Sequence, residues 1–392
     1  MKIKYLIFFL SLNILAQEND KVTIGDIISL KSEILNEDRT LQVYLPESYN
    51  GSTFNYPVLY LLDSEYEFHQ TTGTVNFLSG VGKIPEMIVV GIVNTNRSRD
   101  LTPEAPNDKD SKAFWGEIGG AENFRTFFQK ELIPFIDKKY IPFIDKKYRT
   151  SPYKIIRGQS FGGLFGLFDF FDTPLFNAYI ITSPTVRWNN NELFKKLNRY
   201  TYNKGVKTKI YIGEAEFDSG DDTGIEEFSR LLKSKIKDSI FFKYAFFKGE
   251  GHYSLVYNAT QNGLKFIYKN WELPNKNAIS ANLETLKDHF AKLSNEFGYK
   301  INIPMNDIIR LTNTKLREQN YSAAIKIAKI NIEYYPNQPE TYWHTGDAYT
   351  FAGDYKNALK YFELALQKAL AIGVTDLSEH KNSIQETKMK IK

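Results

Sequence analysis

The stretch Lys154–Gly163, which reads KIIRGQSFGG, decides the fold that this sequence predicts. A short β-branched run leads into Gly-x-Ser-x-Gly, and a further glycine and the apolar run Leu164–Phe168 follow it. This order predicts a strand that turns sharply into a helix with Ser160 at the apex, because the glycines let strand and helix approach closely. Such a turn exposes the serine hydroxyl and directs the first N–H groups of the helix toward a developing negative charge. Ser160 is therefore the candidate nucleophile.

Around this turn, residues 22–271 alternate between short apolar runs and helical patterns. Two of the runs are apolar almost throughout, which is typical of central strands covered by helices on both faces. The alternation predicts an α/β three-layer sandwich with a mostly parallel central sheet. The expected strands are Ile27–Ile34, Arg39–Leu45, Pro57–Leu62, Met87–Val93, Tyr153–Arg157, Ala178–Thr182, Lys209–Ile212 and Ile240–Phe247, and the clearest expected helices are Ala121–Ile136, Leu164–Phe171 and Ile225–Ser239.

The first 16 residues have the features of a secretory signal peptide. Lys2 and Lys4 precede a mostly apolar run that is too short to span a membrane, and Ala16 offers a small-residue cleavage point. We therefore expect a periplasmic or secreted protein. Removal of the two lysines would reduce the net charge from +4 to +2, which does not favour a nucleic-acid partner. The chain contains no cysteine, so thiol catalysis and cysteine-based metal sites are excluded.

Residues 270–277 read as a linker, and the pattern beyond them is helical. We expect the α/β domain over residues 17–274 and a small all-α domain over residues 275–392. In the latter, Asn320-Tyr321-x-x-Ala324-Ile325-Lys326 recurs 34 residues later as Asp354-Tyr355-x-x-Ala358-Leu359-Lys360. This period is typical of tetratricopeptide repeats, here over about residues 306–370, although an ordinary pair of helical hairpins is an alternative. Helices over Ala281–Phe297 and Thr375–Lys390 would flank them.

Residues 133–140 and 141–148 are identical, and each reads IPFIDKKY. Pro142 would interrupt a helix that continued through both copies. The repetition predicts that one copy forms an extra helical turn or a surface bulge without a chemical role.

A serine hydroxyl needs a base, and His252 is the best candidate among five histidines. It follows the last expected strand in a Gly-rich loop, whereas His69 precedes Ser160 in the chain. The third member should be a carboxylate on the loop after the strand Lys209–Ile212, because that loop can turn toward the histidine. Glu216 is the first choice and Asp218 the second; more distant alternatives are Asp221 and Asp222.

Two backbone N–H groups are expected to form an oxyanion hole. One belongs to Phe161, directly after the serine, and the other is assigned to Glu65, in the turn after the strand Pro57–Leu62. Arg97 and Arg99 follow a central strand and could contact an anionic substrate, or one of them could pair with Asp100 and merely hold the loop. Trp188 could line an acyl pocket or simply pack.

Four segments make the chain resemble the Putative esterase family of the α/β-hydrolases, which includes siderophore (enterobactin-type) esterases, feruloyl and acetyl-xylan esterases, S-formylglutathione hydrolases and mycolyltransferases. The resemblance covers about residues 25–270 and implies Ser160 as nucleophile, His252 as base and Glu216 as acid. Asp63-Ser64 departs from the Asp-Gly that the family often has at this point. The segments are Tyr60–Asp63, Asn94–Pro103, Gly158–Leu164 and Gly251–Ser254.

These observations predict an exported serine ester hydrolase that acts on a small-molecule ester, of a siderophore or plant-wall type, without a metal or other cofactor. Acyl transfer to an alcohol other than water would use the same residues. The alternative is a binding protein in which the helical tail captures a protein partner and the α/β domain has little or no activity. The tail could also serve as a lid or in self-association.

Overall fold

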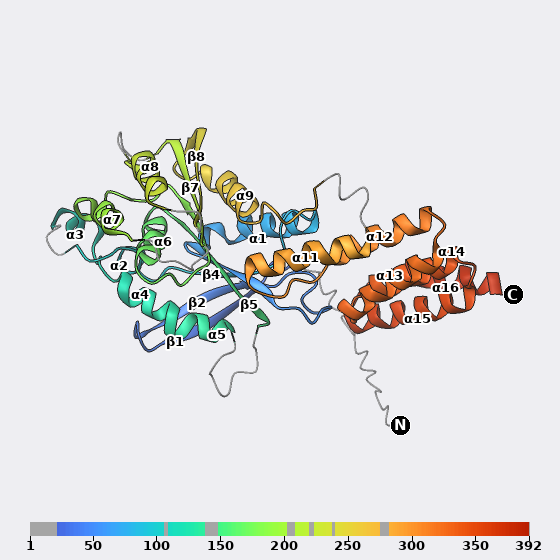
Figure 1. Ribbon diagram of the computed structural model, residues 1–392. Helices are drawn as coiled ribbons and strands as arrows, with labels where there is room; N and C mark the ends of the chain where they lie inside the picture. Colours follow the sequence, from blue (N-terminus) through green and yellow to red (C-terminus); the bar gives the residue numbers. More distant parts are fainter. Residues whose placement is uncertain are drawn as a thin grey trace, which may run out of the picture.

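The computed structural model describes residues 22–105, 109–137, 148–201, 208–218, 223–236, 240–274 and 282–391. Their strands form one sheet in the order β1-β2-β4-β3-β5-β6-β7-β8 (Figure 1). Strand β2 pairs antiparallel with β1 and β4, and all pairs from β4 to β8 are parallel. The strands are β1 (Asp26–Ser32), β2 (Glu37–Tyr44), β3 (Tyr56–Leu61), β4 (Ile88–Ile92), β5 (Thr150–Gln159), β6 (Ala178–Thr182), β7 (Thr208–Phe217) and β8 (Ile240–Gly251). The predicted α/β sandwich is confirmed.

Helices cover both faces of the sheet, and this explains why the central strands are apolar at nearly every position. Every residue of β3, β4 and β6 is buried. Alternate residues of these strands enter two separate cores, as expected for a sheet covered on both sides. One core includes residues of α4 (Ala121–Phe127), α6 (Phe161–Phe171), α7 (Trp188–Arg199) and α8 (Ile225–Lys235); the other includes residues of α1 (Ser64–Gly80), α9 (Leu255–Ile267) and α11 (Leu283–Phe297).

The helix expected over residues 121–136 is present but irregular. The α-helix α4 passes into a π-helical turn, η1 (Phe128–Leu132), and then into α5 (Ile133–Asp137). Pro134 lacks an N–H group and cannot continue the usual hydrogen-bond ladder, which is a physical reason for the change in pitch. Most of the second copy of the repeated segment lies outside the described residues, as does the predicted signal peptide.

The C-terminal region is helical, as predicted. Helix α11 leads to two antiparallel pairs, α12 with α13 and α14 with α15, and to a final helix, α16 (Figure 1). Within the described part of the chain, no helix is both long enough and apolar enough to cross a membrane. The bounds are α12 (Met305–Arg317), α13 (Tyr321–Tyr334), α14 (Pro339–Phe351), α15 (Tyr355–Ala371) and α16 (Ser378–Ile391). The assignment of these pairs to tetratricopeptide repeats stays a prediction.

The tail is attached to the amino ends of the parallel strands. Phe297 of α11 packs edge-on against Tyr153, near the start of β5, with ring centroids 5.0 Å apart. Tyr335, after α13, packs against Phe54, which precedes β3, at 4.9 Å. In Figure 1 the tail, orange to red, projects from the end of the molecule opposite to α2 (Arg97–Leu101), α3 (Lys109–Trp115) and α7. This placement argues against a lid over the carboxyl ends of the strands.

A buried lysine fastens α11 to the sheet. The Nζ atom of Lys209 in β7 donates to Oε1 of Glu296 at 2.7 Å and to the carbonyl of Ile267 at 2.6 Å. The same ammonium lies 4.2 Å from the ring centroid of Phe297. Burial lowers the pKa of Lys209, and the neighbouring Glu296 carboxylate opposes that effect. The charge of Lys209 is therefore tolerated because α11 supplies its partner.

We expect Glu296→Gln to lower the free energy of unfolding by about 1–3 kcal/mol, because a buried cation loses its carboxylate. The measurement is the shift of the thermal unfolding transition relative to the wild type. Glu284→Gln is the matched control on the same helix, since Glu284 pairs with Lys287 at the surface and should change nothing measurable. Equal shifts in both variants would contradict the role given to Glu296.

Candidate active site

The predicted strand–turn–helix is found around Ser160. Strand β5 ends at Gln159, helix α6 begins at Phe161, and Ser160 between them has φ 57° and ψ −114°. This backbone conformation is strained for a residue with a side chain. It is held by hydrogen bonds on both sides, from the Ser160 N–H to the Thr182 carbonyl and from the Leu164 N–H to the Ser160 carbonyl, each 2.9 Å long. Ser160 is therefore locked at the carboxyl end of a central strand.

The close approach of β5 and α6 explains the glycines of the motif. A Cβ atom on Gly158 would lie 2.3 Å from the carbonyl oxygen of Gly162, a distance that no side chain tolerates. A Cβ atom on Gly163 would lie 3.0 Å from the side chain of Pro184. Glycine is required by the packing of the turn at Gly158, whereas at Gly163 a side chain would fit only if Pro184 moved slightly.

His252 lies on the loop between β8 and α9, as predicted, and its Nδ1 atom is in hydrogen-bond contact with Oδ1 of Asp218. Asp218 is the first residue after β7, and its side chain is only 5% exposed. A carboxylate can only accept, so this contact favours the tautomer with hydrogen on Nδ1 and leaves Nε2 free to take a proton. The side chain of Gln159 donates to the carbonyl of His252 and so ties this loop to the residue before Ser160.

Glu216, the first choice for the acid, does not contact the histidine. Its Oε2 atom accepts a hydrogen bond of 2.7 Å from the N–H of Gly249, and its side chain is exposed. The expected strand ended at Ile212, whereas β7 continues to Phe217 with an irregularity in its pairing between Ala215 and Phe217. The choice of Glu216 was wrong in this respect, and Asp218, the second choice, takes the position beside His252. Asp221 and Asp222 lie outside the described residues.

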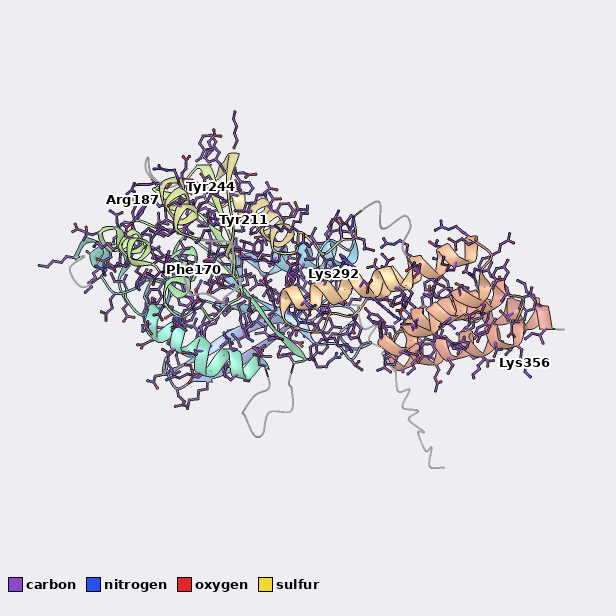
Figure 2. The ribbon with its side chains drawn as sticks, viewed as in Figure 1. Phe170, Arg187, Tyr211, Tyr244, Lys292 and Lys356 are labelled. Atoms are coloured by element: carbon purple, nitrogen blue, oxygen red, sulfur yellow. The ribbon has the colours of Figure 1, made fainter. Side chains whose placement is uncertain are left out.

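A second acid of the same strand supports the loop that carries Asp218. Glu214 is buried, and its two oxygens accept from the hydroxyls of Thr223 and Tyr244. Tyr244, which is labelled in Figure 2, lies on β8, the edge strand next to β7. Burial, with the hydrogen bond to Glu214, raises the pKa of Tyr244, so this hydroxyl remains a donor at neutral pH. Thr223, five residues beyond Asp218, is thus held against β7.

The N–H groups of Phe161 and Glu65 both lie in first turns of helices, α6 and α1 respectively. The first N–H groups of a helix have no partner within that helix and can bind an anion. The two helices meet at this point, because a Cβ atom on Gly162 would lie 3.4 Å from Oδ2 of Asp63, the residue before α1. The arrangement is compatible with the predicted pair of oxyanion donors.

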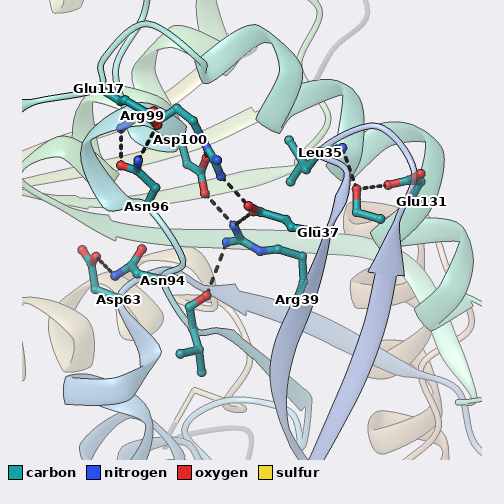
Figure 3. Close-up of polar contacts among 12 residues, drawn as sticks. Leu35, Glu37, Arg39, Asp63, Asn94, Asn96, Arg99, Asp100, Glu117 and Glu131 are labelled. Carbon is teal, nitrogen blue, oxygen red and sulfur yellow. Dashed lines mark hydrogen bonds and ion pairs between the residues drawn. The ribbon is translucent and has the colours of Figure 1, made fainter.

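Arg97 does not present a free guanidinium to solvent. Its Nε and Nη2 atoms donate to the two carboxylate oxygens of Asp63 at 2.6 and 2.9 Å, and Nη2 also donates to the carbonyl of Gln159 at 3.2 Å. Asn94 donates to the same carboxylate at 2.8 Å (Figure 3). The prediction that Arg97 binds an anionic substrate is therefore not supported by its contacts.

Arg99 is also engaged, in a network with β2. Its Nε atom donates to Asp100 at 2.7 Å and its Nη2 atom to Glu37 at 2.8 Å (Figure 3). Arg39, fully buried on β2, donates to the same two carboxylates at 2.6 and 2.7 Å. The structure bears out the alternative that Arg99 pairs with Asp100 and holds the loop. The network of Arg39, Arg99 and their two carboxylates fixes α2 to the sheet.

Aromatic side chains surround the residue after the candidate nucleophile. The ring of Phe161 contacts Trp188 at 5.3 Å and Trp115 at 5.0 Å, both edge-on. Trp188 is 6% exposed, and its indole N–H donates to the carbonyl of Pro103 at 3.1 Å, so it packs behind Phe161. Trp115 is 46% exposed and was not among the predicted site residues. Its only signal in the sequence was the pair Phe114-Trp115 in a polar stretch.

Within the described part of the chain, no group of three or more His, Asp or Glu side chains is placed to hold a metal ion. Ser160, His252 and Asp218 directly follow the carboxyl ends of β5, β8 and β7. A hydroxyl, an imidazole and a carboxylate are the groups used in nucleophilic attack and proton transfer.

Comparison with known proteins identifies the family to which the chain belongs. The profile of the family described as "Putative esterase" matches residues 32–267. Ferri-bacillibactin esterase BesA of Bacillus subtilis (strain 168) is 30% identical over 259 residues, which are 59% of this chain and 86% of BesA. The crystal structure of an IroE-like serine hydrolase from Shewanella oneidensis is similar with a TM-score of 0.65 and 25% identity, over 79% of this chain and 99% of that one.

The similarity also extends into the tail. The crystal structure of an uncharacterised protein from Capnocytophaga ochracea DSM 7271 covers 93% of this chain and 99% of that chain, with a TM-score of 0.56. The identity is 18%, so this likeness concerns the fold alone. It shows that an α/β sheet followed by a helical extension of this size occurs in another protein.

Proposed function

Since the chain belongs to the Putative esterase family, we propose that it is an exported serine hydrolase that cleaves a carboxylic ester through an acyl-enzyme. The observation that carries the proposal is the contact between His252 Nδ1 and Asp218, on a loop tied to the strained turn at Ser160. A nucleophile, a base and a residue that orients the base are the parts that acyl transfer to serine requires.

The proposed reaction has two halves. Ser160 Oγ attacks the ester carbonyl while Nε2 of His252 accepts its proton, and the N–H groups of Phe161 and Glu65 stabilise the negative charge on the carbonyl oxygen. His252 then returns the proton to the leaving alcohol. Water repeats the same sequence on the acyl-enzyme and frees the acid. Asp218 holds the imidazole in the reactive tautomer and stabilises its charged form.

We propose a siderophore-type ester as the substrate, because the relatives named above include an esterase of ferri-bacillibactin. A plant-wall ester is the alternative, since the same residues would serve either acyl group. Export is proposed from the N-terminal sequence, and its test is the N-terminal residue of the protein recovered from the periplasm or the medium.

The decisive experiment is covalent labelling by a fluorophosphonate, with hydrolysis of p-nitrophenyl acetate measured on the same samples. The wild type should be labelled on the peptide that contains Ser160 and should release p-nitrophenol. Ser160→Ala should be folded, unlabelled and inactive. A folded wild type that neither reacts with the probe nor hydrolyses the ester would refute the proposal.

Trp115 should contribute to the binding of an aromatic acyl group. Its ring is half exposed beside Phe161, one residue from the nucleophile, and a stacked aromatic pair contributes about 0.5–1.5 kcal/mol beyond burial. We expect Trp115→Ala to raise KM for a benzoate ester about 3- to 10-fold relative to the acetate of the same alcohol. Phe114→Ala is the control, because Phe114 is 77% exposed and contacts Trp115 rather than Phe161. An equal rise for both esters would contradict ring stacking.

A further inference from the structure

We propose that Arg97 is a positioning residue that holds the two N–H donors of the oxyanion hole at their working separation. The inference rests on the proposed function, since it concerns the same site. It replaces the substrate contact that was predicted for Arg97 from the sequence.

The guanidinium of Arg97 connects both halves of the proposed oxyanion hole. On one side it binds both carboxylate oxygens of Asp63, two residues before Glu65. On the other side it donates to the carbonyl of Gln159, directly before Ser160, and lies 5.5 Å from the centroid of the Phe161 ring. One planar group thus fixes the start of α1 against the start of α6. A bidentate contact constrains direction as well as distance, which a single hydrogen bond does not.

Asp63 needs such a constraint. Its backbone has φ 55° and ψ 37°, the left-handed conformation that a residue with a side chain adopts at a cost. Its side chain is 8% exposed and receives Arg97 and the amide of Asn94. The same Asn94 amide donates to the Glu65 carboxylate at 2.7 Å. The side chains of Asp63 and Glu65 are therefore held by Asn94, in the loop after β4, and by Arg97, at the start of α2.

The contacts of Arg97 oppose a direct role in substrate binding. Its charge is already paired with Asp63, and its Nε and Nη2 atoms are both engaged. Because a nearly buried carboxylate already balances its charge, the guanidinium attracts an anionic substrate less than an unpaired cation would. The guanidinium instead acts through the backbone that it orients.

This role predicts an effect on the transition state rather than on substrate binding. An oxyanion is stabilised only when the donors lie about 2.7–3.1 Å from it, and a misplacement of about 1 Å costs on the order of 100-fold in rate. The uncharged carbonyl of the bound ester depends much less on these donors. Loss of Arg97 should therefore lower kcat and leave KM nearly unchanged.

The test compares the wild type with Arg97→Gln, Arg97→Lys, Asp63→Asn and the double variant Arg97→Gln/Asp63→Asn. The readouts are kcat and KM for p-nitrophenyl acetate, and Ki for a trifluoromethyl ketone, which serine attacks to give a bound oxyanion. We expect Arg97→Gln to lower kcat about 10- to 100-fold, to raise Ki by a similar factor and to keep KM within about threefold. Arg97→Lys should recover only part of kcat, because an ammonium cannot form the bidentate contact. The double variant should be no worse than Arg97→Gln, because both changes break the same link.

Arg310→Gln is the matched control. It removes an exposed arginine of α12, in the helical tail, that pairs with Asp307 and contacts neither Asp63 nor Gln159. Its kcat should stay within about threefold of the wild type. A rise in KM with unchanged kcat in Arg97→Gln would instead assign Arg97 to substrate binding, and unchanged kinetics would refute the proposal.

Amide hydrogen exchange keeps this test separate from that of the proposed function. Peptides that contain residues 63–66 and 160–164 should exchange faster in Arg97→Gln than in the wild type, and Arg310→Gln should leave them unchanged. If the wild type hydrolyses no ester and resists the fluorophosphonate, the proposed function fails, while the exchange data still decide the positioning role. Unchanged exchange in Arg97→Gln would refute it.

Discussion

Replacement of Asp218 by Asn is expected to lower kcat about 10⁴-fold with little change in KM. The amide can donate to Nδ1 of His252, which would place the imidazole hydrogen on Nε2 and leave no base for the Ser160 proton. The side chain of Asp218 is 5% exposed, and Asn has nearly the same shape, so the fold should be retained. The measurement is the steady-state hydrolysis of p-nitrophenyl acetate, with circular dichroism to verify the fold.

Glu216→Gln is the matched control for this prediction. Glu216 lies two residues away, and its exposed carboxylate accepts a hydrogen bond from Gly249 N–H, which an amide oxygen can also accept. We expect kcat to stay within about threefold of the wild type, as for a surface change outside the reacting groups. If Glu216→Gln were the more damaging variant, the loop would adopt a different arrangement during catalysis, and Glu216 would regain the role first given to it.

Most of the fold could be predicted from the sequence because the strands and the turn at Ser160 have local signals. Apolar runs such as Val58–Leu62 are explained by burial on both faces, and all eight expected strands are present. The turn depends on Gly158, where a side chain would clash with the backbone of Gly162 four residues later. Each of these signals depends on neighbours in the chain.

The errors concern features that depend on contacts between distant segments. The end of β7 could not be found from its own residues, because its last part is stabilised by pairing with β8, with an irregularity before Phe217. That extension moved the histidine partner from Glu216 to Asp218. The partners of Arg97 and Arg99, Asp63 and Glu37, lie 34 and 62 positions away in the chain. A sequence shows that an arginine is present, but not that its charge is already paired.

The helix that carries Arg97 depends on a charge network with its own stability requirement. Arg39 on β2 is fully buried, and its Nη1 atom donates to Asp100 at 2.6 Å and to Glu37 at 2.7 Å (Figure 3). Asp100 is 1% exposed and also receives Arg99 at 2.7 Å. The positive charges of the two arginines are thus balanced by the negative charges of the two carboxylates, in a region from which water is largely excluded. Removal of one member leaves a buried charge without full compensation.

Arg39→Met is expected to lower the free energy of unfolding by about 3–5 kcal/mol, because Asp100 remains buried with only the partly exposed Arg99 as its partner. Contacts of the guanidinium with the Phe124 ring, 5.2 Å from its centroid, are lost as well. The measurement is the midpoint of denaturant unfolding, followed by tryptophan fluorescence. Arg39→Met/Asp100→Asn should recover part of the loss, since the second change removes the uncompensated charge. The double variant could instead lose as much free energy of unfolding as Arg39→Met and Asp100→Asn lose together. In that case Arg39 would stabilise the protein through its packing against Phe124, and α2 would be held by that packing and not by charge pairing.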